Sequence, residues 1–178
     1  MNKKLMYVAL LGLAFSQLQG CSAIDRRTTS AYVGDQEIEL RAMQALSDNF
    51  PQKNDNIAAT SFNRQVLLTG QVPDEAMKAK ATEVIKAVPE VRTVFNELAV
   101  SGVVSLTSYT SDSTLTSKVK TRLWDDKRAP GTKIKVKTES GTVYLMGLLT
   151  RAEAAAAADV ARTTAGVTKV VTLFEYID

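Results

Sequence analysis

Histidine is absent from the 178 residues of this chain, and cysteine occurs only once, at Cys21. The lack of histidine excludes a Ser-His-Asp triad, a histidine general base and a histidine metal site. A single cysteine cannot form a disulfide framework or a cysteine metal site. A carboxylate or Ser/Lys mechanism remains open in principle, but no spacing in the sequence favours one. We therefore predict no catalytic residue, no metal and no cofactor, and we expect a protein that is not an enzyme.

Long apolar segments are also scarce, and the one that stands out lies at the N-terminus. Residues 5–15 are apolar and follow Lys3 and Lys4, an order typical of a signal peptide and too short to span a bilayer. The tetrapeptide over residues 18–21, Leu-Gln-Gly-Cys, resembles the bacterial lipobox. This resemblance implies that residues 1–20 are removed and that Cys21 is acylated. The alternative is an ordinary signal peptide with a chance cysteine.

Residue 22 bears on the membrane that would receive this anchor. It is Ser22 rather than Asp. In the Gram-negative lipoproteins that the chain resembles, Asp at this position favours retention in the inner membrane. Ser22 therefore predicts an outer-membrane lipoprotein, held by its lipid at the periplasmic face.

An internal repeat at an offset of 77 residues divides the rest of the chain. Asp35 matches Asp112 and Gly70 matches Gly147, with apolar matches between them. Each copy follows the order helix, strand, strand, helix, strand. We predict a flexible tether over residues 21–34, a first domain over 35–100, a linker over 101–111 and a second domain over 112–178.

Local signals place the elements of each copy. Asp112 is a suitable N-cap for a helix, and Thr150 with Glu153 forms a capping box for another. Strict alternation over residues 133–137 predicts a strand with one exposed face. Gly70 and Gly147 indicate a close helix–sheet approach or a bend. The expected elements are helices 35–48 and 74–87 with strands near Ile57 and Val66 and over 91–100, then a helix from Asp112, strands 133–137 and 143–147, helix 151–164 and strand 167–177.

The motifs VLLTGQV…VPEVRTV and VYLMGLL…AGVTKVV resemble the BON domain. The resemblance covers residues 35–178, and with the lipobox the whole chain is similar to the dual-BON outer-membrane lipoproteins. It implies an α+β fold of two tandem αββαβ BON domains, each a three-stranded mixed sheet packed on two helices. It also implies a non-catalytic protein that binds anionic phospholipid through its second domain and supports outer-membrane integrity.

The two copies differ in net charge. Residues 35–100 carry 7 basic and 10 acidic side chains, a net charge of −3, whereas residues 112–178 carry 11 and 8, a net charge of +3. The only tryptophan, Trp124, lies in the basic segment 118–137, about 140° from the apolar stripe of its helix at about 100° per residue. Such a tryptophan suits a membrane interface. The expected lipid-binding residues are Thr114, Ser117, Lys118, Lys120, Arg122, Trp124, Lys127 and Arg128.

Two other interpretations of the same pattern stay open. A basic segment is often only a solvated face, and a tryptophan at the end of a helix can fold back over the core. Oppositely charged domains also suit a protein-interaction or chaperone-like module that acts with the outer-membrane protein assembly machinery. Nucleic acid is not an expected partner, because the mature chain has 20 basic and 19 acidic side chains. The expected partners are therefore an anionic phospholipid membrane or that machinery.

Overall fold

The computed structural model describes residues 26–50, 56–101 and 109–178. The predicted signal peptide and Cys21 lie outside these ranges, as does most of the predicted linker. Within the described residues no helix is both long enough and apolar enough to cross a membrane.

Domain 1 consists of two helices packed on one face of a sheet. β2 is its central strand, antiparallel to β1 and parallel to β3 and β4. Val66 and Leu68 of β2 are buried against Ile38 and Ile85 of the two helices, as expected for alternate residues of a strand. The elements are α2 (Thr29–Asn49), β1 (Asn56–Phe62), β2 (Gln65–Val72), α3 (Glu75–Lys86), β3 (Thr93–Asn96) and β4 (Ala99–Val100).

Domain 2 repeats this arrangement. β6 is central, antiparallel to β5 and parallel to β7. The predicted capping box is confirmed, because the Thr150 side chain accepts from the Glu153 backbone and the Glu153 carboxylate accepts from the Thr150 backbone. The α+β prediction of two mixed sheets, each packed on two helices, is thus confirmed. The elements are α4 (Tyr109–Asp125), η3 (Gly131–Lys133), β5 (Ile134–Glu139), β6 (Thr142–Leu149), α5 (Arg151–Arg162) and β7 (Lys169–Tyr176).

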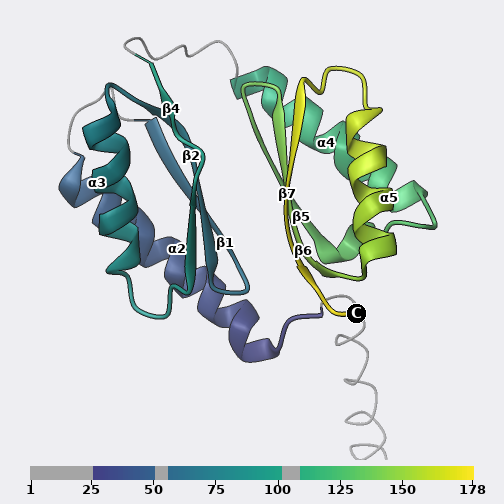
Figure 1. Cartoon of the computed structure of the whole chain (residues 1–178), viewed down its shortest axis with the longest axis horizontal. Helices are drawn as coiled ribbons and strands as arrows, with labels where there is room; N and C mark the ends of the chain where they lie inside the picture. Colours follow the sequence, from purple (N-terminus) through teal and green to yellow (C-terminus); the bar gives the residue numbers. More distant parts are fainter. Residues whose placement is uncertain (1–25, 51–55, 102–108) are drawn as a thin grey trace, which may run out of the picture.

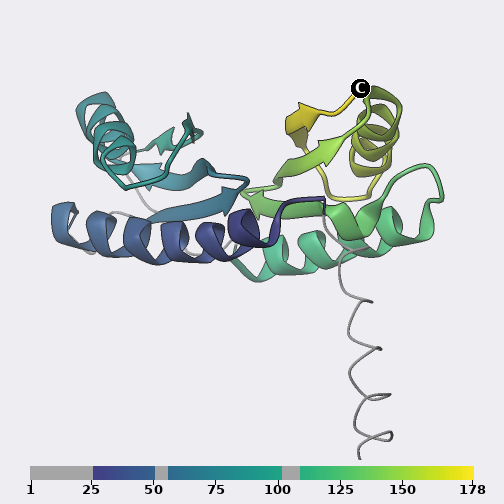
Figure 2. The same cartoon turned by 90° about the horizontal axis from the view of Figure 1, so that it is seen from below.

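The two sheets face each other across the middle of the molecule, with the helices on the outer sides (Figure 1). Between them lies an apolar cluster that includes Leu67 of domain 1 and Tyr144 and Met146 of domain 2. Lys135 of β5 donates to the Glu39 carboxylate of α2 at 2.6 Å. The two domains therefore form one four-layer body. Figure 2 shows α2 and α4 along one common side of it, with α3 and α5 on the other.

Both first helices begin earlier than the sequence predicts. α2 begins at Thr29, where the Thr28 side chain caps it by accepting from the Ala31 backbone, and not at Asp35. α4 begins at Tyr109, so Asp112 lies in its first turn and is not the N-cap. The predicted tether over residues 21–34 is therefore partly helical.

The two matched aspartates have a different task. Asp112 accepts from the backbone N–H groups of Ser140 and Gly141 at 2.7 and 2.9 Å, in the turn between β5 and β6. Asp35 accepts in the same way from Asn63 and Arg64 in the turn between β1 and β2. Each carboxylate thus fixes the first helix of its domain to the hairpin.

The last strand of domain 1 and its central glycine also differ from expectation. The predicted strand over residues 91–100 is divided into β3 and β4, both paired with β2. Gly70 has a φ of +119°, and a Cβ there would lie 1.8 Å from the Asn56 carbonyl oxygen. The close approach at Gly70 is therefore between β2 and β1 rather than between a helix and the sheet.

Candidate functional site

The outward side of α4 carries the candidate site. Leu115, Val119 and Leu123 bury the opposite side in the core of domain 2. Because a helix advances by about 100° per residue, Thr114, Ser117 and Trp124 point away from this stripe. All three are exposed, and the hydroxyl of Ser117 donates to the Ser113 carbonyl at 3.1 Å.

Trp124 is the most exposed large apolar side chain of the described residues, with 73% of its surface accessible. The loop after α4 fixes its position, since a Cβ on Gly131 would lie 2.6 Å from the Leu123 carbonyl carbon and 2.8 Å from the Trp124 nitrogen. The prediction that this ring lies off the core is confirmed. An indole held in water on a rigid helix end is available to a binding partner.

The predicted cations divide into two groups. Lys118, Lys120 and Lys127 are exposed, and no carboxylate of the described residues forms an ion pair with them. Arg122 instead binds α5, because its guanidinium donates to the Val160 carbonyl and to the hydroxyls of Thr164 and Thr163 at 3.2, 2.8 and 3.1 Å. Arg122 thus has a structural role as well, and its contact with lipid stays a prediction.

Arg128 is also engaged within the protein. Its guanidinium donates to both carboxylate oxygens of Asp126, at 3.0 and 2.7 Å, and lies 3.7 Å from Asp159. Its hydrogen bonds lower the pKa of Asp126 to about 2. Arg128 is exposed, but its charge is balanced. Only part of the basic segment 118–137 therefore carries a positive charge that is not balanced by a nearby carboxylate.

Two arginines that the sequence reasoning missed hold the chain before α2. Arg26 donates to both oxygens of Glu153 at 2.6 and 2.8 Å and to the Leu148 carbonyl at 3.0 Å, all in domain 2. This pairing lowers the pKa of Glu153 to about 2. Arg27 donates to the buried Asp35 of domain 1 at 2.7 Å. Residues 26 and 27 therefore clamp the start of the chain to both domains.

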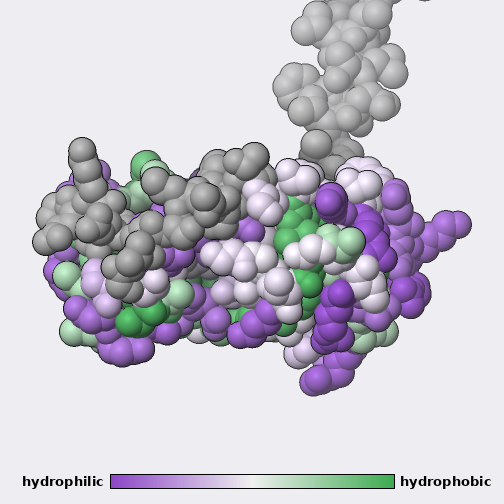
Figure 3. Space-filling view, turned by 90° about the horizontal axis from the view of Figure 1, so that it is seen from above, coloured by the Kyte–Doolittle hydropathy of each residue, from purple (hydrophilic) through white to green (hydrophobic). Residues whose placement is uncertain are grey.

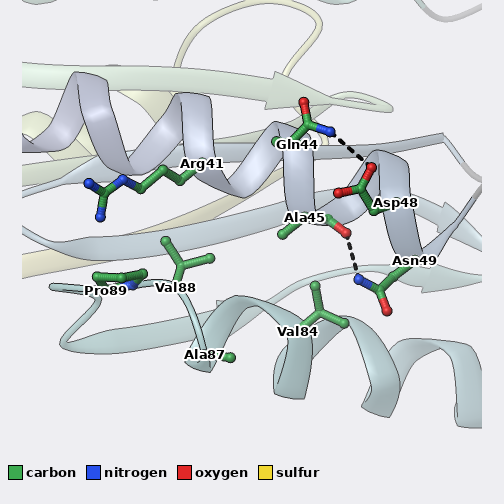
Figure 4. A pocket seen from close by; sticks show the side chains of 9 residues that line it. All are labelled: Arg41, Gln44, Ala45, Asp48, Asn49, Val84, Ala87, Val88 and Pro89. Carbon is green, nitrogen blue, oxygen red and sulfur yellow. Dashed lines mark hydrogen bonds between the residues drawn. The ribbon is translucent and has the colours of Figure 1, made fainter.

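A shallow groove of about 650 Å³ lies between α2 and α3. Figure 4 shows Gln44 donating to Asp48 and Asn49 donating to the Ala45 carbonyl along its rim. Its only ionisable side chains among the described residues that line it are Arg41 and Asp48. This groove holds no arrangement of groups for acid–base or nucleophilic chemistry.

Hydrophilic residues dominate the face seen in Figure 3 and gather at the outer end of domain 2, with only small apolar areas between them. Among the described residues no group of three or more His, Cys, Asp or Glu side chains could hold a metal ion. The outward side of α4 therefore remains the strongest site of domain 2, and its chemistry is that of a surface which binds.

Comparison with known proteins agrees with this architecture. The chain is 40% identical over 157 residues to the outer membrane lipoprotein DolP of Haemophilus influenzae, covering 88% of this chain and 81% of that protein. It is 32% identical to a 21 kDa hemolysin of Actinobacillus pleuropneumoniae, over 86% of this chain and 80% of the hemolysin. Osmotically-inducible protein Y of Escherichia coli is 30% identical, over 78% and 71% of the two chains. The BON-domain model matches residues 34–102 and 111–178, so this chain belongs to the BON-domain family with two copies of the domain.

Proposed function

We propose that this protein is a non-catalytic outer-membrane lipoprotein, acylated at Cys21, that faces the periplasm and binds anionic phospholipid through domain 2. In this way it supports the integrity of the outer membrane. The likeness to an outer membrane lipoprotein supports the anchor, as does the lipobox-like segment that ends at Cys21. Several acyl chains on one residue hold a protein to a bilayer far more firmly than a single chain does.

The observation that carries the phospholipid site is the exposed Trp124 of α4 with Lys120 one turn before it, a lysine that pairs with no carboxylate of the described residues. An indole ring at a membrane interface places its apolar body among the acyl chains and its N–H among the headgroups. Lys118, Lys120 and Lys127 lie on or next to α4. Each cation near an anionic leaflet contributes about 1 kcal/mol, decaying within a Debye length.

The anchor makes a weak site sufficient. Once Cys21 is in the bilayer, contact between α4 and the headgroups is an intramolecular event with a high effective concentration. The anchor therefore supplies retention at the membrane, and α4 supplies orientation and headgroup preference.

Sedimentation with vesicles of graded anionic content tests the α4 site, using the lipid-free mature chain from residue 22. Trp124→Glu should abolish most binding, whereas Trp124→Phe should keep much of it because a ring remains. Lys118→Glu with Lys120→Glu changes the charge of α4 by four units and should remove most electrostatic attraction. Arg122 is left unchanged in this variant, since Arg122→Glu would break its bonds to α5.

A matched control is Lys78→Glu with Lys86→Glu on α3, on the far side of the molecule (Figure 2). It makes the same change in net charge and should leave binding nearly unchanged. Circular dichroism verifies that each variant is folded. If both α4 variants bind as the wild type does, the lipid site lies elsewhere.

The second candidate function is a protein-interaction or chaperone-like module that acts with the outer-membrane protein assembly machinery. The opposite net charges of the two domains, −3 and +3, favour it. Part of that charge is used within the molecule, where Lys135 pairs with Glu39. A wild-type chain that ignores anionic vesicles would favour this second function.

A further inference from the structure

The outward side of α2 in domain 1 carries three exposed apolar residues, and none of the described residues covers them. Val33, Leu40 and Met43 have 59%, 66% and 62% of their surfaces accessible. At about 100° per residue Val33 and Leu40 lie opposite the side of α2 that is buried in the core, which includes Ile38 and Ala42, and Met43 lies at the edge of the exposed side. Most exposed helix faces carry charge, so this strip of apolar residues on α2 needs an explanation.

The charged groups of α2 beside this strip are largely paired. Glu37 pairs with Arg41 along the helix, and Glu39 pairs with Lys135 of domain 2. Asp35 is buried and pairs with Arg27. An anionic surface that approaches α2 would therefore meet uncharged side chains and paired carboxylates, with little net repulsion.

The apolar strip of α2 lies on the same side of the molecule as α4. Figure 2 shows both helices along one edge of the molecule, with α3 and α5 at the other edge. Trp124 projects from the outward face of α4 near the end of that helix. A flat surface that contacts Trp124 can thus reach α2 as well.

The start of the chain limits how far α2 can lie from the membrane. Arg26 and Arg27 hold the residues before α2, as described above. Cys21 precedes Arg26 by five residues, a reach of about 17–18 Å when fully extended at about 3.3–3.6 Å per residue. The first turns of α2 therefore cannot lie far from a bilayer that holds Cys21.

We propose that Val33, Leu40 and Met43 of α2 form a second membrane contact, inserted into the interfacial layer of the bilayer that carries the anchor. This inference rests on the proposed lipid anchor at Cys21. Domain 1 contributes an apolar, charge-independent contact, whereas α4 contributes a cationic one. With two contacts and one anchor, the whole α2–α4 side lies flat on the membrane.

Site-specific probes on the lipidated protein in anionic vesicles test this contact. Because the thiol of Cys21 is acylated in that protein, a cysteine introduced at Leu40 carries the only free thiol. An environment-sensitive fluorophore on Leu40→Cys should shift to the blue and be quenched by lipids that carry a shallow quencher. The matched control is Ala79→Cys, at an exposed position of α3 on the opposite side, where the probe should stay in water.

Trp124, the only tryptophan, reports on α4 in the same samples. Quenching of both Trp124 and the probe at position 40 supports the two contacts. Quenching of Trp124 alone overturns this inference, leaves the proposed function intact and assigns the strip to a protein partner. If neither is quenched, membrane contact fails at both helices. A Cys21 thiol that reacts with the fluorophore shows that the proposed anchor itself is wrong.

A second measurement uses the lipid-free mature chain. Leu40→Asp with Met43→Asp should weaken vesicle binding by about tenfold, since partial burial of two such side chains corresponds to about one decade in affinity. Ala76→Asp with Ala79→Asp, at exposed positions of α3, adds the same charge on the other side. Equal binding by the two double variants would refute the contact, with circular dichroism confirming that both fold.

Discussion

Replacing Asp35 by alanine should lower the stability of the protein more than replacing Asp112, the matched aspartate of domain 2. Asp112 binds two backbone N–H groups, those of Ser140 and Gly141. Asp35 binds the equivalent pair in its own hairpin and in addition the Ser61 hydroxyl at 2.7 Å and the Arg27 guanidinium at 2.7 Å. Asp35 is fully buried and the side chain of Arg27 is only 8% exposed.

The difference in partners sets the expected difference in stability. Asp112→Ala leaves turn N–H groups without their acceptor, and loss of such bonds costs about 1–3 kcal/mol. Asp35→Ala also breaks the buried ion pair with Arg27, and breaking such a pair costs about 3–5 kcal/mol. Arg27 retains stacking over the Tyr32 and Phe62 rings, at 4.9 and 4.3 Å from the centroids. Asp35→Ala should therefore lose about 2 kcal/mol more than Asp112→Ala.

Urea unfolding of the mature chain measures both losses. Far-UV circular dichroism follows the whole protein, while Trp124 fluorescence follows domain 2, since the chain has only one tryptophan. Asp35→Ala should shift the dichroism midpoint more than the fluorescence midpoint. Asp112→Ala should shift the fluorescence midpoint at least as much as the dichroism midpoint. Equal losses for the two variants would refute the argument that Arg27 depends on Asp35.

Three further outcomes follow from particular contacts. Gly70→Ala should lower the stability of domain 1 by more than about 2 kcal/mol, seen as a drop in Tm, because its Cβ would overlap the Asn56 carbonyl oxygen. The pKa of Glu153 is held at about 2 by Arg26, below its ordinary value of 4.5. The stability that this pair contributes is therefore full above pH 4.5 and lost as the pH falls toward 2. In Arg26→Ala the free energy of unfolding should therefore fall less over this pH range than in the wild type. Cys21→Ser should leave the protein unprocessed or soluble in membrane fractionation, and tight retention after a high-salt wash would rule out the anchor.

Much of the fold follows from local sequence signals. The capping box at Thr150, the turn at Ser140 and Gly141, and the apolar stripe of α4 each act within a few residues, so the sequence contains all of their determinants. The helix starts were wrong because an aspartate suits two tasks. It is a good N-cap and also a good acceptor for a turn that packs beside the helix, and only the hairpin position decides between them.

The candidate site was predictable where it depends on one helix and unpredictable where it depends on packing. The outward direction of Trp124 follows from helical periodicity alone. The bonds of Arg122 to α5 and of Arg26 to Glu153 join residues 38 or more positions apart, and no local pattern encodes them. The apolar strip of α2 was detectable from its spacing opposite the core, but the late predicted start of that helix left Val33 in the tether.

The faces on which the two domains meet show how the repeat has diverged. On β6, Tyr144, Met146 and Leu148 belong to or pack against the apolar cluster between the sheets. On β2 the same side carries Gln65, Thr69 and Gln71 around Leu67, since alternate residues share a face.

These three polar side chains each bury an oxygen that has no hydrogen-bond partner among the described residues, which opposes association by about 1–3 kcal/mol for each buried group. The pairing of the domains therefore depends on charged contacts as well as on the apolar cluster. Arg92 and Asn63 of domain 1 bind Glu175 of domain 2, and Lys135 binds Glu39. Because Arg26 and Arg27 bind opposite domains just before α2, the segment nearest the proposed anchor also holds the start of α2 against domain 2.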